Sequence, residues 1–179
     1  EQNARERANS FLVRAVFYHF KSIVSMPAAT TTAASSKKPR CPTASNWLEY
    51  HDNVWGKQIR DSRDLFEMLS LCSQQAGLNW RTIWGKRAAY NKAFHDFDML
   101  RVAAMTEDDV QSLIERHQAM RSSGVDKKQL VLCSAPKLRA IVNNAKLCVD
   151  IEKEHKGGLS GFLWGFMPNG APLANAEAY

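Results

Sequence analysis

Apolar residues recur at helical spacing along most of the chain after residue 40. One such pattern runs from residue 61 to residue 77 and includes Leu65, Phe66, Met68, Leu69 and Cys72. Asp61, followed three residues later by Asp64, is typical of a helix start, and Gly77 is typical of a helix end. The pattern therefore predicts a helix over residues 61–77.

Further patterns predict helices over 79–95, capped by Asn79, and over 137–153, close behind Pro136. Thr106 and Asp109 are spaced as a capping box ahead of a further apolar pattern, which consists of Val110, Leu113 and Ile114. FLWGF at 162–166 predicts a last short element. Because no alternating strand pattern competes with these helices, we expect an all-α bundle.

Two segments lack such a pattern. RSSGVDKKQLVLCSAP, between Arg121 and Pro136, contains turn residues, and we interpret residues 122–135 as an inserted loop. Residues 1–36 are expected to have no stable packed core, because MPAATTTAASSKKPR is poor in apolar residues. Before it, FLVRAVFYHFKSIVSM resembles a targeting segment, although a start of translation at Met26 explains the same residues.

Length and composition fit one globular domain, since the chain has 179 residues of which 45% are hydrophobic. We assign residues 1–39 to a disordered or targeting-like segment and residues 40–179 to the helical domain. No run approaches the roughly 20 apolar residues of a membrane span, so no membrane association is expected. The chain ends in PNGAPLANAEAY, a loop-like run, so we expect the C-terminal part of the domain to be missing.

Charge alone gives little evidence for a nucleic-acid partner. The net charge is +6, but residues 1–40 hold seven Lys or Arg against two Glu. The remaining residues hold 17 basic and 16 acidic groups, so any DNA-binding face depends on local arrangement. Four widely spaced cysteines favour a reducing, intracellular compartment: the nucleus or mitochondrion in a eukaryote, the cytoplasm in a bacterium.

Two stretches carry the most specific signal: EYHDNVWG at 49–56 and LCSQQAGLNW at 71–80. With KRAAYNKAFHDFD, AAMTEDDV, PKLRAIVNNAK and FLWGF in the same order, they resemble the DNA-3-methyladenine glycosylase I family over most of residues 40–166. The resemblance implies a helix-hairpin-helix glycosylase fold. It also implies base-excision repair by a monofunctional glycosylase that removes 3-methyladenine from double-stranded DNA, with the protein acting as a monomer.

The resemblance also implies site residues. Tyr50 and Trp80 take the positions that line the flipped base, with Gln74 and Gln75 on the neighbouring turn. A cationic alkylated adenine gains from aromatic faces, because stacking on Trp adds cation–π attraction. Without the resemblance, Trp80 and Tyr50 are interpreted as packing residues, as Trp55 and Trp84 are here.

The catalytic position departs from the family. Cys72 stands where the family has Glu in LEGQQAG, and Ser73 replaces the following Gly. A thiol is a weak donor and a poor acceptor, so losing one charge-assisted bond costs roughly 1.5–3 kcal/mol of recognition. A nucleophilic role for Cys72 is disfavoured because the motif has no His or Lys to lower its pKa. The departure leaves two alternatives, a non-catalytic DNA-lesion-binding protein and a remnant with no ligand.

The resemblance further implies DNA-backbone and metal contacts. Lys127, Lys128 and Lys137 lie around the family's backbone-contacting loop, although the favoured interpretation of the first two is a pair of solvated lysines. Cys41 and His51 match two ligands of a structural zinc, whereas the other two have no counterpart here. Since zinc favours four N or S ligands, we expect a half-site that binds the ion weakly.

Overall fold

The computed structural model describes residue 50 and residues 53–166, and every regular element in this part of the chain is helical. The all-α prediction is therefore confirmed. The chain divides into two compact units, one of residues 60–163 and one of residues 1–59 with 164–179. The predictions for residues 1–36 lie outside the described residues.

The larger unit begins with α3 (Ser62–Gln74), whose start agrees with the predicted cap. The Asp61 carboxylate accepts hydrogen bonds from the backbone N–H groups of Arg63 (2.9 Å) and Asp64 (3.0 Å). Side chains on one face of this helix are buried, and they include Leu65, Phe66, Leu69 and Leu71. The helix ends three residues earlier than predicted, in a turn that leads to Gly77 at φ +76°.

The predicted single helix over 79–95 is wrong, because the segment forms three short elements. These are α4 (Trp80–Trp84), α5 (Arg87–Ala93) and the 3-10 turn η1 (His95–Phe97). The helix breaks at Gly85 and at Lys86, whose φ of −105° and ψ of 3° are not helical. His95, Asp96 and Phe97 then adopt positive φ values, and this turn leaves Phe97 fully buried.

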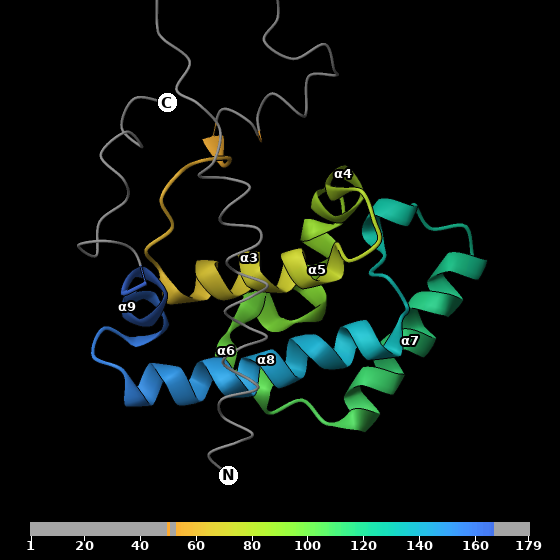
Figure 1. Ribbon diagram of the computed structural model, residues 1–179. Helices are drawn as coiled ribbons and strands as arrows, with labels where there is room; N and C mark the ends of the chain where they lie inside the picture. Colours follow the sequence, from red (N-terminus) through yellow and green to blue (C-terminus); the bar gives the residue numbers. More distant parts are fainter. Residues whose placement is uncertain (1–49, 51–52, 167–179) are drawn as a thin grey trace, which may run out of the picture. The chain divides into compact units, whose positions relative to one another are not determined.

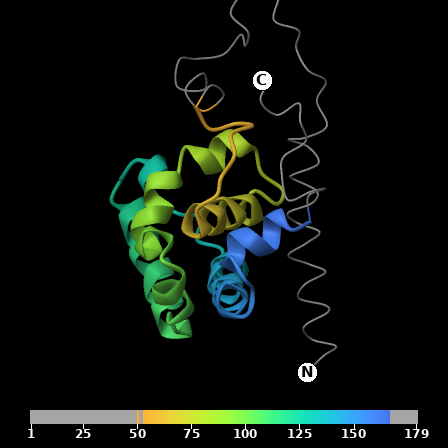
Figure 2. The same ribbon diagram turned by 90° about the vertical axis from the view of Figure 1, so that its left-hand side faces the viewer.

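The remaining elements are α6 (Met99–Ala103), α7 (Glu107–Ser122), η2 (Lys127–Gln129), α8 (Ala135–Glu154) and α9 (Gly158–Trp164). Thr106 and Asp109 form the predicted capping box at the start of α7. Pro136 lies in the first turn of α8, where a missing N–H is tolerated. Figures 1 and 2 show α3 and α8 side by side with similar axes, and α6 packs against α8.

The interpretation of residues 122–135 as an inserted loop needs correction, because the segment is tied to the core and its first and last residues are helical. Ser122 still belongs to α7, and Leu130 and Val131 are only 4% and 3% exposed. The N–H of Val131 donates to Nδ1 of His117 (3.3 Å), a buried residue of α7. Leu130 and Val131 therefore belong to the core, whereas most of residues 122–129 are exposed.

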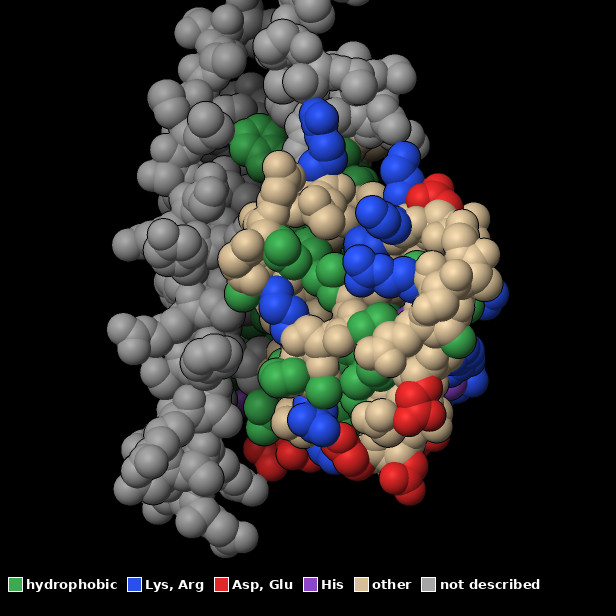
Figure 3. Space-filling view, turned by 90° about the vertical axis from the view of Figure 1, so that its right-hand side faces the viewer, with side chains coloured by type: hydrophobic (Ala, Val, Ile, Leu, Met, Phe, Trp, Pro, Cys, Tyr) green, Lys and Arg blue, Asp and Glu red, His purple; other side chains and the backbone are tan. Residues whose placement is uncertain are grey.

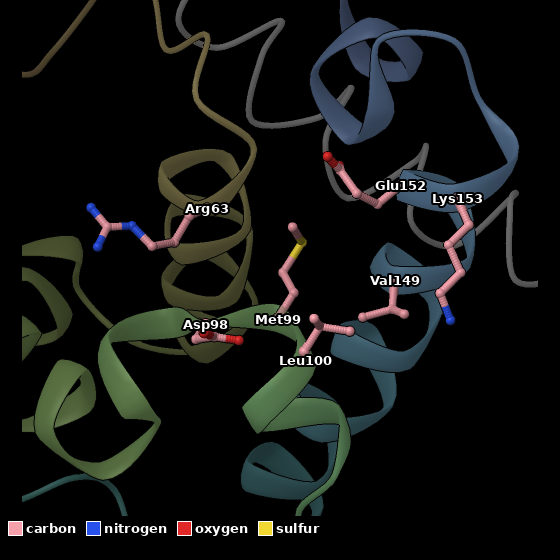
Figure 4. Close-up of a pocket in the computed structure, with 7 residues that line it drawn as sticks. All are labelled: Arg63, Asp98, Met99, Leu100, Val149, Glu152 and Lys153. Atoms are coloured by element: carbon pink, nitrogen blue, oxygen red, sulfur yellow. The ribbon is translucent and has the colours of Figure 1, made fainter.

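A hollow of about 360 Å³ opens at the surface of the larger unit, between α3, α6 and α8 (Figure 4). Met99, Leu100 and Val149 form its apolar wall, and Leu100 is 66% exposed. Arg63 and Lys153 also line it. None of its lining residues belongs to the motif at 71–80, so it is not the site that the motif predicts.

Candidate active site

The motif at 71–80 forms the end of α3, a tight turn and the start of α4. The turn is closed by a hydrogen bond from the Leu78 N–H to the Gln75 carbonyl (2.6 Å). Asn79 caps α4 as predicted, because its side-chain oxygen accepts from the Arg81 N–H at 2.7 Å. Trp80 is thus the first residue of a helix that starts six residues after Gln74.

Gln74 anchors this turn from inside the core, where its side chain is fully buried. Its amide nitrogen donates to the Lys137 carbonyl at 2.9 Å, and its amide oxygen accepts from the Tyr90 hydroxyl at 3.4 Å. The same hydroxyl accepts from the Leu132 N–H at 3.3 Å. Gln74 therefore holds the turn against α5 and α8, while Gln75 beside it is partly exposed. Base contact by either glutamine stays a prediction.

Cys72 is a partly exposed, free thiol near the end of α3. Burial raises its pKa to about 12, so the neutral thiol is the form present at physiological pH. This agrees with the expectation that Cys72 is no nucleophile. The hydroxyl of the adjacent Ser73 donates back to the Ser70 carbonyl at 2.7 Å, within its own helix.

Trp80 and Trp84 form a pair on α4, with ring centroids 5.9 Å apart and planes tilted by 32°. Both rings are half-buried, so the interpretation of Trp84 as a core residue is only partly right. The guanidinium of Arg87 lies 4.8 Å from the centre of the Trp84 ring. This arrangement gives α4 an aromatic surface, formed by two half-buried indole rings directly after the turn.

The predicted backbone-contacting lysines differ in their surroundings. Lys127 and Lys128 are exposed in η2, whereas the ammonium of Lys137 donates to the carbonyls of Gln74 and Ala76, both at 2.7 Å. Lys137 thus caps the C-terminus of α3. Figure 3 shows Lys and Arg side chains gathered on the upper part of one face, with Asp and Glu along its lower edge.

Lys86 is a residue that the sequence pattern did not single out. Its ammonium donates to the Leu130 carbonyl at 2.7 Å and also to the Lys127 carbonyl. Burial lowers its pKa, and the nearby Arg121 and Lys127 act in the same direction. Only a break in the helix at this position would have marked Lys86, and the sequence pattern predicts one continuous helix through it.

Tyr50 belongs to the smaller unit, where it is 8% exposed. Its carbonyl accepts from the N–H groups of Val54 and Trp55, both at 2.9 Å. The predicted base-lining role of Tyr50 remains a prediction. Cys41 and His51 lie outside the described residues, and the part that is described contains no group of three or more His, Cys, Asp or Glu placed to hold a metal.

A family model for methyladenine glycosylases matches residues 40–179. The chain belongs to the methyladenine glycosylase family. A DNA-3-methyladenine glycosylase of Haemophilus influenzae is 40% identical over 139 residues, covering 76% of this chain and 68% of the relative. DNA-3-methyladenine glycosylase 1 of Escherichia coli is 38% identical over 121 residues, covering 68% and 58%.

The methyladenine glycosylase fold is also found among solved structures. A structure of 3-methyladenine DNA glycosylase I from Staphylococcus aureus, described as the basis of 3-methyladenine recognition, superposes with a TM-score of 0.60 at 39% identity. The match covers 72% of this chain and 61% of that one. The helical arrangement described above is therefore that of the family.

In the described part of the chain, no helix is long and apolar enough to cross a membrane.

Proposed function

We propose that this chain binds alkylated double-stranded DNA and removes 3-methyladenine from it as a monofunctional glycosylase of reduced rate. The main support for the proposal is the structure of residues 71–80, which form the end of α3, a turn and the start of α4. The turn, which Gln74 anchors, places the aromatic surface of α4 directly after it. The names of the relatives in Haemophilus influenzae and Escherichia coli support the choice of base. As in the sequence-based expectation, the protein acts as a monomer.

The reaction requires little general acid or base catalysis from the protein. Methylated at N3 in DNA, adenine is cationic, so the base leaves as a neutral molecule when the bond to the sugar carbon breaks. Water then adds to that carbon and releases a proton to the solvent. The protein must flip the base, hold it and admit water. Trp80 is proposed to supply the stacking face, and Tyr50 is proposed as a second base-lining residue because the resemblance to the family implies it.

Cys72 sets the expected rate. In place of a carboxylate it offers a neutral thiol, as its pKa of about 12 requires. A charge-assisted hydrogen bond missing from the transition state costs roughly 1.5–3 kcal/mol, which corresponds to about a tenfold to hundredfold loss of rate. We therefore expect slow excision, and we expect Cys72→Glu to raise it.

The test is release of 3-methyladenine from methylated duplex DNA by the wild type and by Cys72→Glu. Cys72→Ser serves as the matched control, because it changes the same atom and adds no charge. Excision that Glu does not accelerate beyond Ser would show that the carboxylate is dispensable in this member.

Trp80 is tested separately by lesion binding. Trp80→Ala removes the stacking face and should weaken binding to methylated duplex by about 1–3 kcal/mol. Leu100→Ala is the control, since it truncates an exposed apolar residue that does not line the site. Equal losses of binding affinity in the two variants would show that Trp80 does not line the proposed base-binding site.

The neutral thiol of Cys72 also favours a second function, in which the protein recognises the lesion without excising it. The two functions separate in one experiment, because a binding protein retains methylated duplex more tightly than unmethylated duplex yet releases no base. Release of base in proportion to active protein would exclude this alternative.

A zinc ion held in part by Cys41 and His51 is a separate proposal and contributes no step to the reaction. Two N or S ligands fall short of the four that a structural zinc site uses. Titration of zinc against a colorimetric chelator should therefore show only weak binding, and tight stoichiometric binding would contradict the half-site.

A further inference from the structure

A buried carboxylate holds an arginine beside the aromatic surface of α4. Glu67 of α3 is only 7% exposed. Nε of Arg87 donates to one of its carboxylate oxygens at 2.5 Å, and Nη2 donates to the other at 2.7 Å. This two-point pairing fixes the plane of the guanidinium, and the hydrogen bonds to Glu67 raise the pKa of Arg87.

The same guanidinium contacts Trp84. Its central carbon lies 4.8 Å from the centre of the Trp84 ring, and the Trp84 ring in turn lies 5.9 Å from that of Trp80. Glu67, Arg87, Trp84 and Trp80 therefore form a continuous series of contacts. It starts at a buried position in α3, passes through the first residue of α5 and ends at the proposed base-stacking ring on α4.

We propose that Arg87 is a positioning residue for base recognition: fixed by Glu67, it packs against Trp84 and thereby sets the orientation of Trp80. This inference deepens the proposed function and rests on it. Arg87 is not expected to touch the base itself. Its effect on binding is transmitted through the two tryptophan rings.

The local structure explains why such a support is needed. With five residues, α4 is barely more than one helical turn, and it ends at Gly85. A helix this short does little to restrict the rings of Trp80 and Trp84, which lie one turn apart on its surface. Arg87 supplies a rigid contact from outside the helix.

The pairing with Glu67 also has an electrostatic consequence. An unpaired guanidinium two rings away from the pocket would disfavour a cationic base, whereas the Glu67 carboxylate offsets that charge. Lysine cannot replace arginine here, because an ammonium is a point charge that lacks the planar fork with which arginine pairs with both carboxylate oxygens while contacting the indole.

The experiment compares Arg87→Met and Arg87→Lys with Arg101→Met, which removes an exposed arginine from α6. The first readout is circular dichroism of the full chain, since two indole rings at this separation give an exciton couplet that depends on their mutual angle. Loss of the couplet in Trp84→Phe assigns it to this pair. We expect Arg87→Met to reduce the couplet by more than half, Arg87→Lys to restore it only partly and Arg101→Met to leave it unchanged.

The second readout is excision kinetics on methylated duplex DNA. Since a stacking contact holds the base in the bound complex and in the transition state alike, Arg87→Met should raise KM about fivefold to tenfold with kcat changed less than about twofold. If the single variant fails to fold, Glu67→Met with Arg87→Met removes the buried carboxylate as well, and the same readouts apply to that folded protein.

A folded protein without Arg87 that keeps the wild-type couplet and the wild-type KM would overturn the inference. If the wild-type chain releases no base, the proposed function fails, yet the couplet still decides whether Arg87 orients the tryptophan pair. The release assay therefore tests the proposed function, and the couplet separately tests the positioning role of Arg87.

Discussion

Gln74 and Lys137 bind each other reciprocally across the junction of α3 and α8. The Gln74 amide donates to the Lys137 carbonyl at 2.9 Å, and the Lys137 ammonium donates to the Gln74 carbonyl at 2.7 Å. The ammonium also reaches the Ala76 carbonyl. One lysine therefore neutralises the end of α3 and joins the motif turn to the start of α8.

Lys137→Met should lower the free energy of unfolding by about 1 kcal/mol, because it removes a cation from a helix C-terminus together with two hydrogen bonds. Lys146→Met is the matched control, since Lys146 is exposed further along α8. Urea unfolding of both variants measures the difference. Equal stability would mean that solvent replaces the lysine without loss.

Lys127 and Lys128 should bind phosphate, whereas Lys137 should not. Each of Lys127→Met and Lys128→Met is expected to reduce the slope of log binding constant against log salt by about one. Lys137→Met should weaken binding without changing that slope, because its ammonium is occupied by carbonyls. The measurement is duplex affinity at several salt concentrations, and an unchanged slope for both loop lysines would show that they are merely solvated.

His117 should make stability depend on pH below neutrality. Burial lowers its pKa, and so do the nearby charges of Arg116, Lys86 and Lys92. In the folded protein the neutral ring accepts the Val131 N–H, whereas the unfolded chain takes up a proton near pH 6.5. The unfolded state then binds more protons, so this contribution is present above about pH 7 and declines as the pH falls from about 6.5 to the lower pKa of the folded state.

The check is urea unfolding at pH 7.5 and pH 5.5 for the wild type and His117→Gln. Glutamine keeps an acceptor and does not titrate, so the variant should lose less stability between the two pH values. The same loss in both proteins would assign the pH dependence to other groups.

In a thiol-labelling experiment, Cys133 should react faster than the other cysteines in the described part of the chain. Burial raises the pKa of both Cys72 and Cys148 to about 12, so at pH 8 these thiols are almost entirely protonated and react slowly. In a Cys41→Ser background, we expect one fast thiol with a disulfide reagent and two more after unfolding. A fast thiol that disappears in Cys72→Ser would contradict the neutral state of Cys72.

The sequence predicted best what is local. The caps at Asp61 and Asn79 and the box at Thr106 join residues two or three positions apart, so short patterns identify them. The break at Gly85 was missed because Trp80, Ile83 and Trp84 keep helical spacing up to it and Ala88 continues that spacing beyond it. Periodicity is insensitive to a break that preserves the phase of the pattern.

The contacts that support the site could not be predicted in the same way. Arg87 is hydrogen-bonded to Glu67, which lies twenty positions earlier in the sequence. Lys86 is hydrogen-bonded to Leu130, forty-four positions later, and Gln74 to Lys137, sixty-three positions later. Such pairings depend on how the helices pack, which a single sequence does not encode in any short pattern. The resemblance to the family named the residues around the base and left their supports unassigned.

The segment before α8 is held by three side chains of the surrounding helices: Lys86, Tyr90 and His117 each bind its backbone between residues 127 and 132. Residues 123–126 lie outside these attachments. Gly124 at φ +84° and Asp126, which caps η2, restrict substitution at these two positions, but the exposed turn can lengthen without shifting the register of α8 or the motif turn beside it. In evolution or in engineering, this stretch is the place where the protein can acquire a new contact to its partner while its catalytic framework stays as it is.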